Sequence, residues 1–187
     1  MDTPDPPADD RGHVILVDEL DRPVGVEDKL AAHLDGGKLH RAFSVFLFDS
    51  AGRMLLQRRA AGKYHFGGLW TNACCSHPRQ GERLADGARI RLRHELGIDA
   101  PLEELFSFVY RAEDPASGLT EHEFDHVLVG RFDGAPRPNP DEVSDWRWAD
   151  VRELLEDVRL RPGSYTPWFK LVLDRVVAEM RASDGNP

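Results

Sequence analysis

The sequence has few cysteines, no long apolar run and no excess of basic residues. Its two cysteines, Cys74 and Cys75, are adjacent, and neighbouring cysteines rarely pair because the bridge geometry would be strained. A disulfide framework is therefore excluded, whereas a reduced and reactive thiol stays open. No apolar run approaches the ~20 residues that a transmembrane helix needs.

The charge is acidic, with 24 Lys and Arg against 33 Asp and Glu, which gives a formal net charge of −9. An acidic chain without a dense basic block is a poor candidate for binding nucleic acids or anionic membranes. The first ten residues are acidic and rich in proline, and they lack the basic and apolar regions of a signal peptide. We therefore expect a cytoplasmic protein with neither partner, and we expect a monomer.

A chain of 187 residues suits one domain. Residues 1–11 and 182–187 are rich in Pro, Asp, Ser and Gly, which is typical of disordered tails, so we expect a single domain over residues 12–181. The stretch 135–141 predicts a long turn and not a domain boundary.

Short apolar runs predict strands, and apolar residues repeated every four positions predict helices. The expected strands are 13–17, 42–48, 54–57, 106–110, 123–132 and 145–148, with a hairpin turn at 49–52. Helices are expected over 81–96, with Gly97 as a stop signal, over 151–158 and over 167–180. Strands and helices interleave without regular β-α-β units, which favours an α+β fold, a mixed α/β sandwich.

The segment from Asn72 to Pro78 contains both cysteines and His77. A thiol two residues before an imidazole, in a turn before a helix, is a plausible reactive centre. The alternative is that both cysteines are small core residues, because free cysteines are usually buried. Composition by itself favours the core interpretation.

Histidines and carboxylates elsewhere form a possible metal site. If residues 121–123 lie on a strand, Glu121 and Glu123 face the same side, where they repel each other unless a cation or a shared proton lies between them. The alternative is a solvated strand end. With His33, His40 and His77 they make a mixed set of nitrogen and oxygen ligands, which suits six-coordinate Mn²⁺, Mg²⁺, Fe²⁺ or Zn²⁺ better than a tetrahedral structural zinc. Spacing does not show that the five residues converge.

Positive charge gathers at a few points despite the acidic total: Lys29, Arg58, Arg59, Lys63, Arg89, Arg91 and Arg93. Arginine forks together with Mg²⁺ would suit a diphosphate. For each residue, an ordinary surface salt bridge is the alternative.

The segment from Ser76 to Ile98 resembles a degraded Nudix box. Glu82, Glu95 and Gly97 keep their places, but Ser76, Ile90, Arg91 and His94 replace the usual Gly, Arg and two Glu. Nudix hydrolases need those lost carboxylates to hold Mg²⁺ at a diphosphate, so their loss argues against hydrolysis.

The same departures resemble the type I isopentenyl-diphosphate Δ-isomerases, which share the Nudix fold. The similarity runs from about His13 to Trp168, and its anchors are residues 31–33, 39–44, 70–72, 77–78, 110–112, 121–123, 141–143 and 166–168. The resemblance implies a Nudix fold with a mixed sheet flanked by helices. It also implies that the chain interconverts isopentenyl and dimethylallyl diphosphate through a tertiary carbocation, in isoprenoid biosynthesis and without an organic cofactor.

The resemblance further implies a role for each matching residue. Cys75 and Glu123 match the catalytic pair, with Tyr110 and Trp168 as the aromatic residues beside the hydrocarbon. His33, His40, His77, Glu121 and Glu123 match the ligands of a site for Mn²⁺, Mg²⁺ or Zn²⁺. Glu95 and the backbone carbonyl of Cys75 match a second, substrate-linked Mg²⁺ site. Lys29, Arg59, Lys63 and Arg91 match the diphosphate contacts.

The chemistry explains these residue types. An alkene is a very weak base, so its proton donor must be strong or well placed, and a carboxylic acid polarised by a divalent ion fits. Cys75 would serve on the opposite face, provided that a neighbour lowers its thiol pKa from about 8.5. The indole of Trp168 would stabilise the cation. Phe43 and Trp70 could also line the pocket, although we expect both in the core.

Two other functions stay open: a Nudix pyrophosphohydrolase acting on a nucleotide diphosphate, and a Nudix module that binds a metal or ligand without catalysis. The missing helix carboxylates count against the first. The complete reactive set counts against the second.

Overall fold

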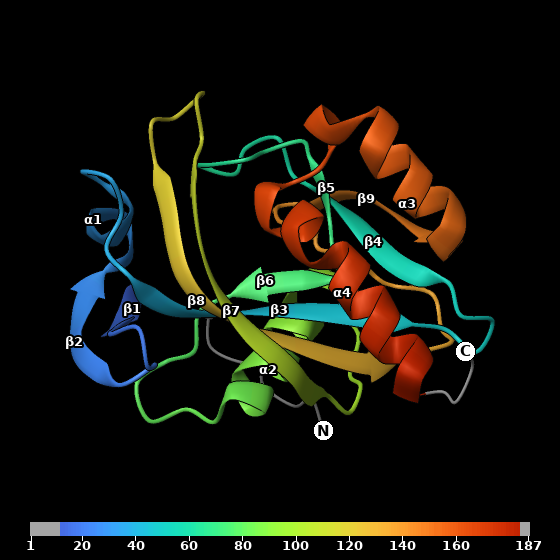
Figure 1. The fold of residues 1–187 in the computed structure, drawn as a ribbon, viewed down its shortest axis with the longest axis horizontal. Helices are drawn as coiled ribbons and strands as arrows, with labels where there is room; N and C mark the ends of the chain where they lie inside the picture. The colour runs from blue at the N-terminus through green and yellow to red at the C-terminus, as the bar shows by residue number, and fades with distance from the viewer. Residues whose placement is uncertain (1–11, 184–187) are drawn as a thin grey trace, which may run out of the picture.

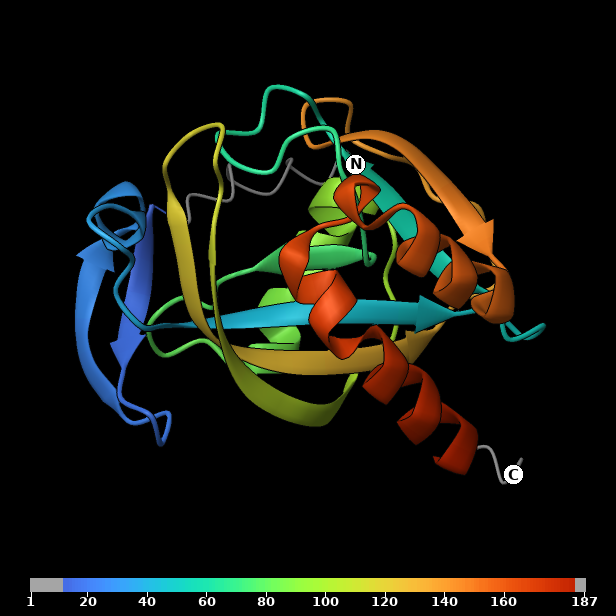
Figure 2. The ribbon, with the colours of Figure 1, turned by 45° about the horizontal axis from the view of Figure 1, so that its top comes forward.

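A computed structural model describes residues 12–183, in which nine strands form one mixed sheet with helices packed against it (Figures 1 and 2). The strands are β1 (His13–Val17), β2 (Pro23–Asp28), β3 (His40–Phe48), β4 (Met54–Arg59), β5 (Trp70–Thr71), β6 (Cys74–Ser76), β7 (Glu103–Glu113), β8 (Thr120–Arg131) and β9 (Val143–Ala149). The helices are α1 (Lys29–His33), α2 (Leu84–Leu96), α3 (Val151–Leu160) and α4 (Pro167–Ser183), and a 3₁₀ turn, η1, covers Pro162–Ser164.

Strand β3 is the centre of the sheet. It pairs in parallel with β8 and antiparallel with β1, β4 and β6. Strand β8 also pairs antiparallel with β7, and β4 pairs antiparallel with β5 and β9. Because β3 is covered on both faces, its sequence is a nearly continuous apolar run, as expected for a strand buried on both sides. The mixed sheet confirms the α+β fold class.

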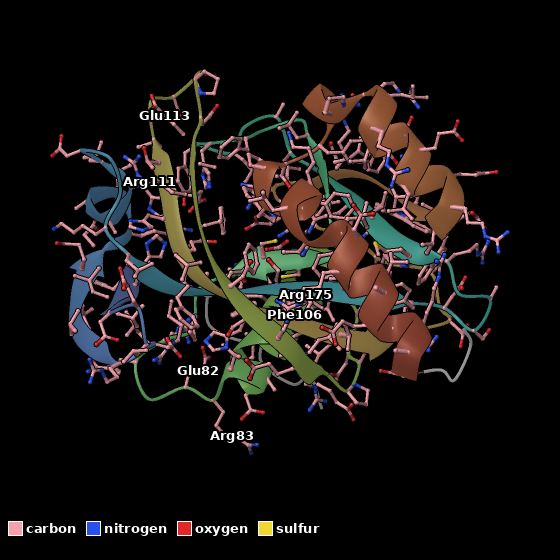
Figure 3. The ribbon with its side chains drawn as sticks, viewed as in Figure 1. Glu82, Arg83, Phe106, Arg111, Glu113 and Arg175 are labelled. Atoms are coloured by element: carbon pink, nitrogen blue, oxygen red, sulfur yellow. The ribbon has the colours of Figure 1, made fainter. Side chains whose placement is uncertain are left out.

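Alternation along β3 produces two hydrophobic cores, one on each face of the sheet. Phe46 and Phe48 pack with α3 and α4, whereas Phe43, Val45 and Leu47 pack with α2. Figure 1 shows α4 crossing the front of the sheet with α2 behind it. At the outer edge of the α4 layer, the guanidinium of Arg175 lies 3.7 Å from the ring centroid of Phe106 on β7 (Figure 3).

The strand predicted over 13–17 matches β1 at both ends. The helix predicted over 81–96 ends where α2 ends, and Gly97 caps it with a φ of 64°, but α2 begins three residues later than predicted, at Leu84. The hairpin turn at 49–52 joins β3 to β4, which pair at Phe48 and Met54. Helix α4 ends at Ser183, one residue beyond the predicted start of the second tail. The rest of that tail and the tail predicted at 1–11 lie outside the described residues.

The elements that the sequence analysis missed are short or exposed. Strand β2 is exposed along most of its length, and β5 and β6 have only two and three residues. Strands β5 and β6 are too short to establish an apolar period, and β2 has no buried face to produce one. Within residues 12–183, no helix is both long and apolar enough to cross a membrane.

The packing of the sheet makes one glycine sensitive to substitution. A Cβ on Gly130 of β8 would lie 2.6 Å from the carbonyl oxygen of Pro101 and 2.9 Å from a methyl carbon of Leu102. We expect Gly130→Ala to lower the free energy of unfolding by about 1–3 kcal/mol, the usual cost of overpacking, as measured by urea denaturation. Gly163→Ala is the matched control, because nothing lies within 4 Å of its added Cβ. Equal stability of the two variants would contradict the expectation.

Candidate active site

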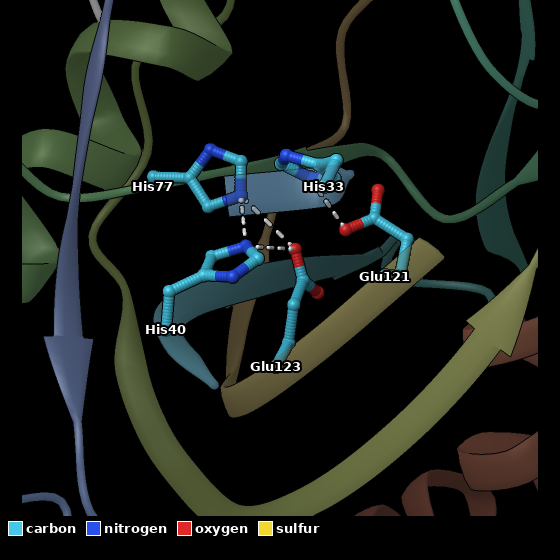
Figure 4. Close-up of side chains that lie close together, drawn as sticks. All are labelled: His33, His40, His77, Glu121 and Glu123. Carbon is cyan, nitrogen blue, oxygen red and sulfur yellow. Dashed lines mark hydrogen bonds and ion pairs between the residues drawn. The ribbon is translucent and has the colours of Figure 1, made fainter. Parts of the chain in front are cut away.

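Three imidazoles and two carboxylates converge at one end of the sheet, although they come from four separate parts of the chain. His33 is the last residue of α1, His40 begins β3, His77 follows β6, and Glu121 and Glu123 lie on β8 (Figure 4). One ligand atom from each of the five lies within 4.8 Å of the others, and all five residues are buried. The structure thus brings together the predicted ligand set, and their role as ligands stays a prediction.

The register of the sheet produces this convergence. The parallel pairing of β3 with β8 sets His40 beside Glu123, and the antiparallel pairing of β8 with β7 sets Glu123 beside Tyr110. Glu121 and Glu123 are two residues apart on a strand, so their side chains leave the same face. The expected shared face is therefore observed, but it is buried, which excludes the alternative of a solvated strand end.

The donor set fits a divalent metal ion. The Nδ1 of His33 lies 2.5 Å from the carbonyl oxygen of Lys29, and the Nδ1 of His40 lies 2.8 Å from that of Lys38. Each Nδ1–H therefore donates to backbone, and each Nε2 faces the carboxylates. This is the arrangement in which outer hydrogen bonds orient imidazole ligands.

The atoms that face one another at the centre of the cluster favour a cation or a shared proton between them. The Nε2 of His33 lies 2.9 Å from the Oε2 of Glu121, and the Nε2 of His77 lies 3.0 Å from the Oε1 of Glu123. The Nε2 atoms of His40 and His77 lie 3.2 Å apart. All of these atoms present lone pairs unless a proton or a metal ion lies between them. The residues present can therefore hold a divalent metal.

Burial sets the protonation of the cluster. It lowers the pKa of His77 to about 3, which keeps this imidazole neutral and able to ligate. Burial alone would raise the pKa of Glu121, but the hydrogen bonds with His33 and His65 outweigh it and hold that pKa well below its ordinary value. A neutral imidazole and an ionised carboxylate are the forms that bind metals.

The two adjacent cysteines point to opposite faces of β6. Cys74 is fully buried in the core beneath α2. Cys75 lies opposite Ser44 on the side of the metal cluster, where its Sγ donates to the Oδ1 of Asn72 at 3.2 Å and lies 3.5 Å from the Oγ of Ser44. The core interpretation is therefore correct for Cys74 and wrong for Cys75, which lines a pocket.

Burial raises the pKa of the Cys75 thiol to about 12, and the hydrogen bonds with Ser44 and Asn72 offset only part of that increase. The thiol accordingly keeps its proton at neutral pH. The lowered pKa expected from the sequence is not found, because desolvation of the thiol raises its pKa and the buried Asp125 adds to the increase. The Oγ of Ser44 donates to the Oδ2 of Asp125 at 2.6 Å, which links the thiol to a further buried carboxyl.

Tyr110 and Trp168 close the apolar side of the pocket. The Tyr110 hydroxyl donates to the Oε2 of Glu123 at 2.5 Å. The indole N–H of Trp168 donates to the Oγ1 of Thr71 at 3.1 Å, and Thr71 donates to the Oδ1 of Asn72 at 2.9 Å. Asn72 also accepts from Cys75, so a continuous hydrogen-bond chain joins the indole to the thiol. The sequence analysis did not identify Thr71, because a threonine on a strand carries no signal of its own.

Four cationic side chains border the same pocket as the thiol and the carboxylates, and they are the four predicted diphosphate contacts: Lys29, Arg59, Lys63 and Arg91. Burial lowers the pKa of Lys29, and it lowers that of Lys63 to about 8, with neighbouring guanidinium groups adding to both shifts. The pocket thus concentrates positive charges that repel one another and are partly desolvated. An anionic ligand would offset this unfavourable electrostatic energy.

The pocket lining does not include the remaining basic residues noted in the sequence, which are Arg58, Arg89 and Arg93. Arg89 and Arg93 form surface ion pairs with Asp99, and Arg58 donates to the carbonyl of Gly68. Phe43 is fully buried in the core, and Trp70 packs against the other core with the guanidinium of Arg147 at 4.7 Å. Neither aromatic residue lines the pocket, in agreement with the expectation for both.

Glu95 is buried beside the cationic wall. Its Oε1 accepts from Arg91 at 2.6 Å, and its Oε2 accepts from Gln57 at 2.8 Å. The same Gln57 amide donates to the carbonyl oxygen of Ala73 at 2.6 Å, which holds Glu95 near the backbone that leads into β6. The second metal site at Glu95 and the Cys75 carbonyl stays a prediction.

The sequence analysis missed His65. This imidazole is buried, lines the pocket and contacts the Oε1 of Glu121 through its Nε2. Burial lowers its pKa. It belongs to the loop between β4 and β5, where no periodicity or motif indicates which side chains turn inward.

Comparison with known proteins agrees with this geometry. Residues 38–169 match the NUDIX domain. Isopentenyl-diphosphate Delta-isomerase 2 of Aromatoleum aromaticum is 59% identical over 165 residues, which cover 88% of this chain and 86% of the relative. Isopentenyl-diphosphate Delta-isomerase of Nocardia farcinica is 51% identical over 172 residues, covering 92% and 98%. The chain belongs to this isomerase family, within the NUDIX fold.

Solved structures support the same fold. A crystal structure of a protein from Deinococcus radiodurans superposes with a TM-score of 0.70 at 24% identity and covers 87% of this chain and 98% of that one. The MutT protein of Methanosarcina mazei superposes with a TM-score of 0.63 at 14% identity, covering 76% and 96%. At these identities the likeness concerns the fold alone, and it confirms the predicted Nudix architecture.

The hydrogen-bond chain at Thr71 can be tested by substitution. We expect Thr71→Val to lower the free energy of unfolding by about 1–3 kcal/mol, because it leaves the buried indole N–H of Trp168 without its acceptor. Urea denaturation measures the loss. Ser144→Ala removes an exposed hydrogen bond to the Arg58 carbonyl and serves as the control, with an expected change within about 0.5 kcal/mol. Equal losses of stability in the two variants would show that the hydrogen bond to Thr71 does not hold Trp168.

Proposed function

We propose that this chain interconverts isopentenyl diphosphate and dimethylallyl diphosphate by moving the double bond between the C3–C4 and C2–C3 positions. One observation carries the proposal: the partly buried thiol of Cys75 and the buried carboxyl of Glu123 border one pocket together with four cationic side chains. An acid–base pair beside an anion-binding wall is what a proton-transfer isomerase of a diphosphate requires. Membership of the isomerase family supports the same reaction.

The cationic wall binds the diphosphate. Arg59 and Arg91 offer planar forks that match phosphate oxygens, and Lys29 and Lys63 add point charges. Lys63 and Arg91 are ion-paired with Glu142 in the structure, at 3.4 Å for Arg91. A diphosphate competes with that carboxylate for both cations. Glu95 and the Cys75 carbonyl would hold a substrate-linked Mg²⁺, which would supply charge neutralisation for the diphosphate.

The His/Glu cluster would hold the second divalent ion, Mn²⁺, Mg²⁺ or Zn²⁺, through His33, His40, His77, Glu121 and Glu123. When bound, that ion supplies Lewis acidity beside the Glu123 carboxyl. The hydrogen bond that Tyr110 donates to Glu123 fixes the other oxygen of this carboxyl and leads from it toward the hydrocarbon side of the pocket.

Glu123 and Cys75 handle the two protons from opposite faces of the substrate. One adds a proton at C4 and the other removes a proton from C2, so the net change is the position of the double bond. The protonated state of Cys75 and its hydrogen bond to Asn72 support a sulfur that exchanges a proton without forming a covalent bond to substrate. The hydroxyl of Tyr110 relays a proton to Glu123.

Trp168 stabilises the tertiary cation that forms at C3 between the two proton transfers. A cation over an indole face gains roughly 0.5–2 kcal/mol, and more when it is desolvated. The buried walls of the pocket, including Trp168 and Tyr110, exclude water that would otherwise trap the cation as an alcohol. The cytoplasmic location and the monomeric state remain predictions.

Turnover in deuterated water tests the reaction. With isopentenyl diphosphate and Mg²⁺, we expect dimethylallyl diphosphate that carries deuterium, because the group that protonates C4 exchanges its proton with the deuterated solvent between turnovers. Mass spectrometry of the product provides the measurement. Release of phosphate would identify a pyrophosphohydrolase, and an unchanged substrate would identify a binding module; either result would overturn the proposal.

The adjacent cysteines provide a matched pair of variants. We expect Cys75→Ala to lower kcat by at least about 10²-fold, the lower range for loss of a general acid or base. Cys74→Ala lies on the other face of β6 in the core and keeps the activity, with only a modest loss of stability. Steady-state assays of dimethylallyl diphosphate formation decide between them. An inactive Cys74→Ala beside an active Cys75→Ala would reverse the assignment.

A further inference from the structure

The imidazole of His65 lies against the metal cluster but outside it. Its Nε2 contacts the Oε1 of Glu121, and the two side chains are only 7% and 4% exposed. Among the described residues, the group whose ligand atoms lie within 4.8 Å of one another consists of three other histidines and two glutamates and does not include His65. His65 therefore approaches the cluster through one of its carboxylates.

The two oxygens of Glu121 have different partners. Its Oε2 lies 2.9 Å from the Nε2 of His33 and faces the cluster, whereas its Oε1 faces His65. A carboxylate with both oxygens free can bind a metal through one oxygen or both. An N–H donor on Oε1 removes that choice and leaves Oε2 for the metal.

The surroundings of the ring fix which nitrogen carries the proton. The Nδ1 of His65 is buried and has no hydrogen-bond partner within the described part of the chain. A proton on Nδ1 would leave a buried donor unsatisfied and would turn the lone pair of Nε2 toward a carboxylate, and both arrangements are unfavourable. The proton therefore belongs on Nε2, which donates to Glu121.

The loop that carries His65 is held in place on both sides. Its backbone carbonyl accepts from Arg59 at 3.2 Å, and the following residue, Phe66, adopts a left-handed φ of 49° with its N–H donating to Asp114 at 3.1 Å. The ring of Phe66 packs edge-on against Trp168 at 5.5 Å. A non-glycine residue keeps a left-handed conformation only where its surroundings determine it. These contacts hold the His65 imidazole in the pocket.

We propose that His65 is a positioning residue for the metal centre, which donates to the Oε1 of Glu121 and fixes this carboxylate as a ligand through Oε2. The proposal rests on the proposed function for the presence of a metal at this cluster. Outer hydrogen bonds of this kind typically change metal affinity by about 10–100-fold.

Binding of Mn²⁺ alone, without substrate, tests the proposal. Competition with a chromophoric chelator at one pH should give an affinity about 10–100-fold lower for His65→Ala than for the unaltered chain. His65→Gln should recover most of the loss, because its amide N–H can donate to the same oxygen. His13→Ala alters an exposed imidazole on β1 and should bind as the unaltered chain does.

Pulsed EPR of the bound Mn²⁺ provides the second readout by counting directly coordinated nitrogens. We expect three coordinated nitrogens both in the unaltered chain and in His65→Gln. The comparison of these two proteins tests whether His65 is a ligand even if His65→Ala does not fold. Four nitrogens falling to three would make His65 a ligand, and an unchanged affinity in His65→Ala would give it no role; either result overturns the proposal. A chain that binds Mn²⁺ through three nitrogens but forms no dimethylallyl diphosphate would instead refute the proposed function and leave this inference standing.

Discussion

Two carboxylates, Glu121 and Glu123, leave the same face of β8 and are buried together. Like charges in a buried site repel strongly, so the surrounding structure has to supply protons, imidazoles or a cation. The end of α1, the start of β3 and the segment after β6 each provide one imidazole to this centre. The fold around the site is therefore organised by the need to compensate these two charges.

The register of the sheet positions the side chains of the site accurately. Side chains held on paired strands are positioned by backbone hydrogen bonds on both sides, which makes a strand-borne site more precise than one built on loops. Strands β7, β8, β3 and β6 lie side by side and contribute Tyr110, Glu123, His40 and Cys75 in that order. The thiol, the carboxyl and the hydroxyl are thus fixed by one continuous ladder.

Charge is distributed unevenly over the molecule. The chain carries a formal net charge of −9, and this overall field would repel a diphosphate. The pocket reverses the field locally with its four cations, two of which, Lys63 and Arg91, are restrained by the buried Glu95 and by Glu142. Restraint of cations before the ligand arrives lowers the entropy cost of binding, which is the benefit of preorganisation. The outer Arg89 and Arg93 have no such part, because Asp99 pairs with both on the surface.

The sequence by itself determined the fold class, the main strands and helices and, through resemblance, the residues that meet at the site, since these depend on local periodicity and on motifs. Composition and periodicity did not separate Cys74 from Cys75, which only the resemblance distinguished, because the strand pairing of β6 decides which side chain faces the pocket. Sequence reasoning missed His65, whose inward direction depends on the strained Phe66 and on Asp114 far along the chain. Contacts between residues that are distant in the sequence are decided by the tertiary structure alone.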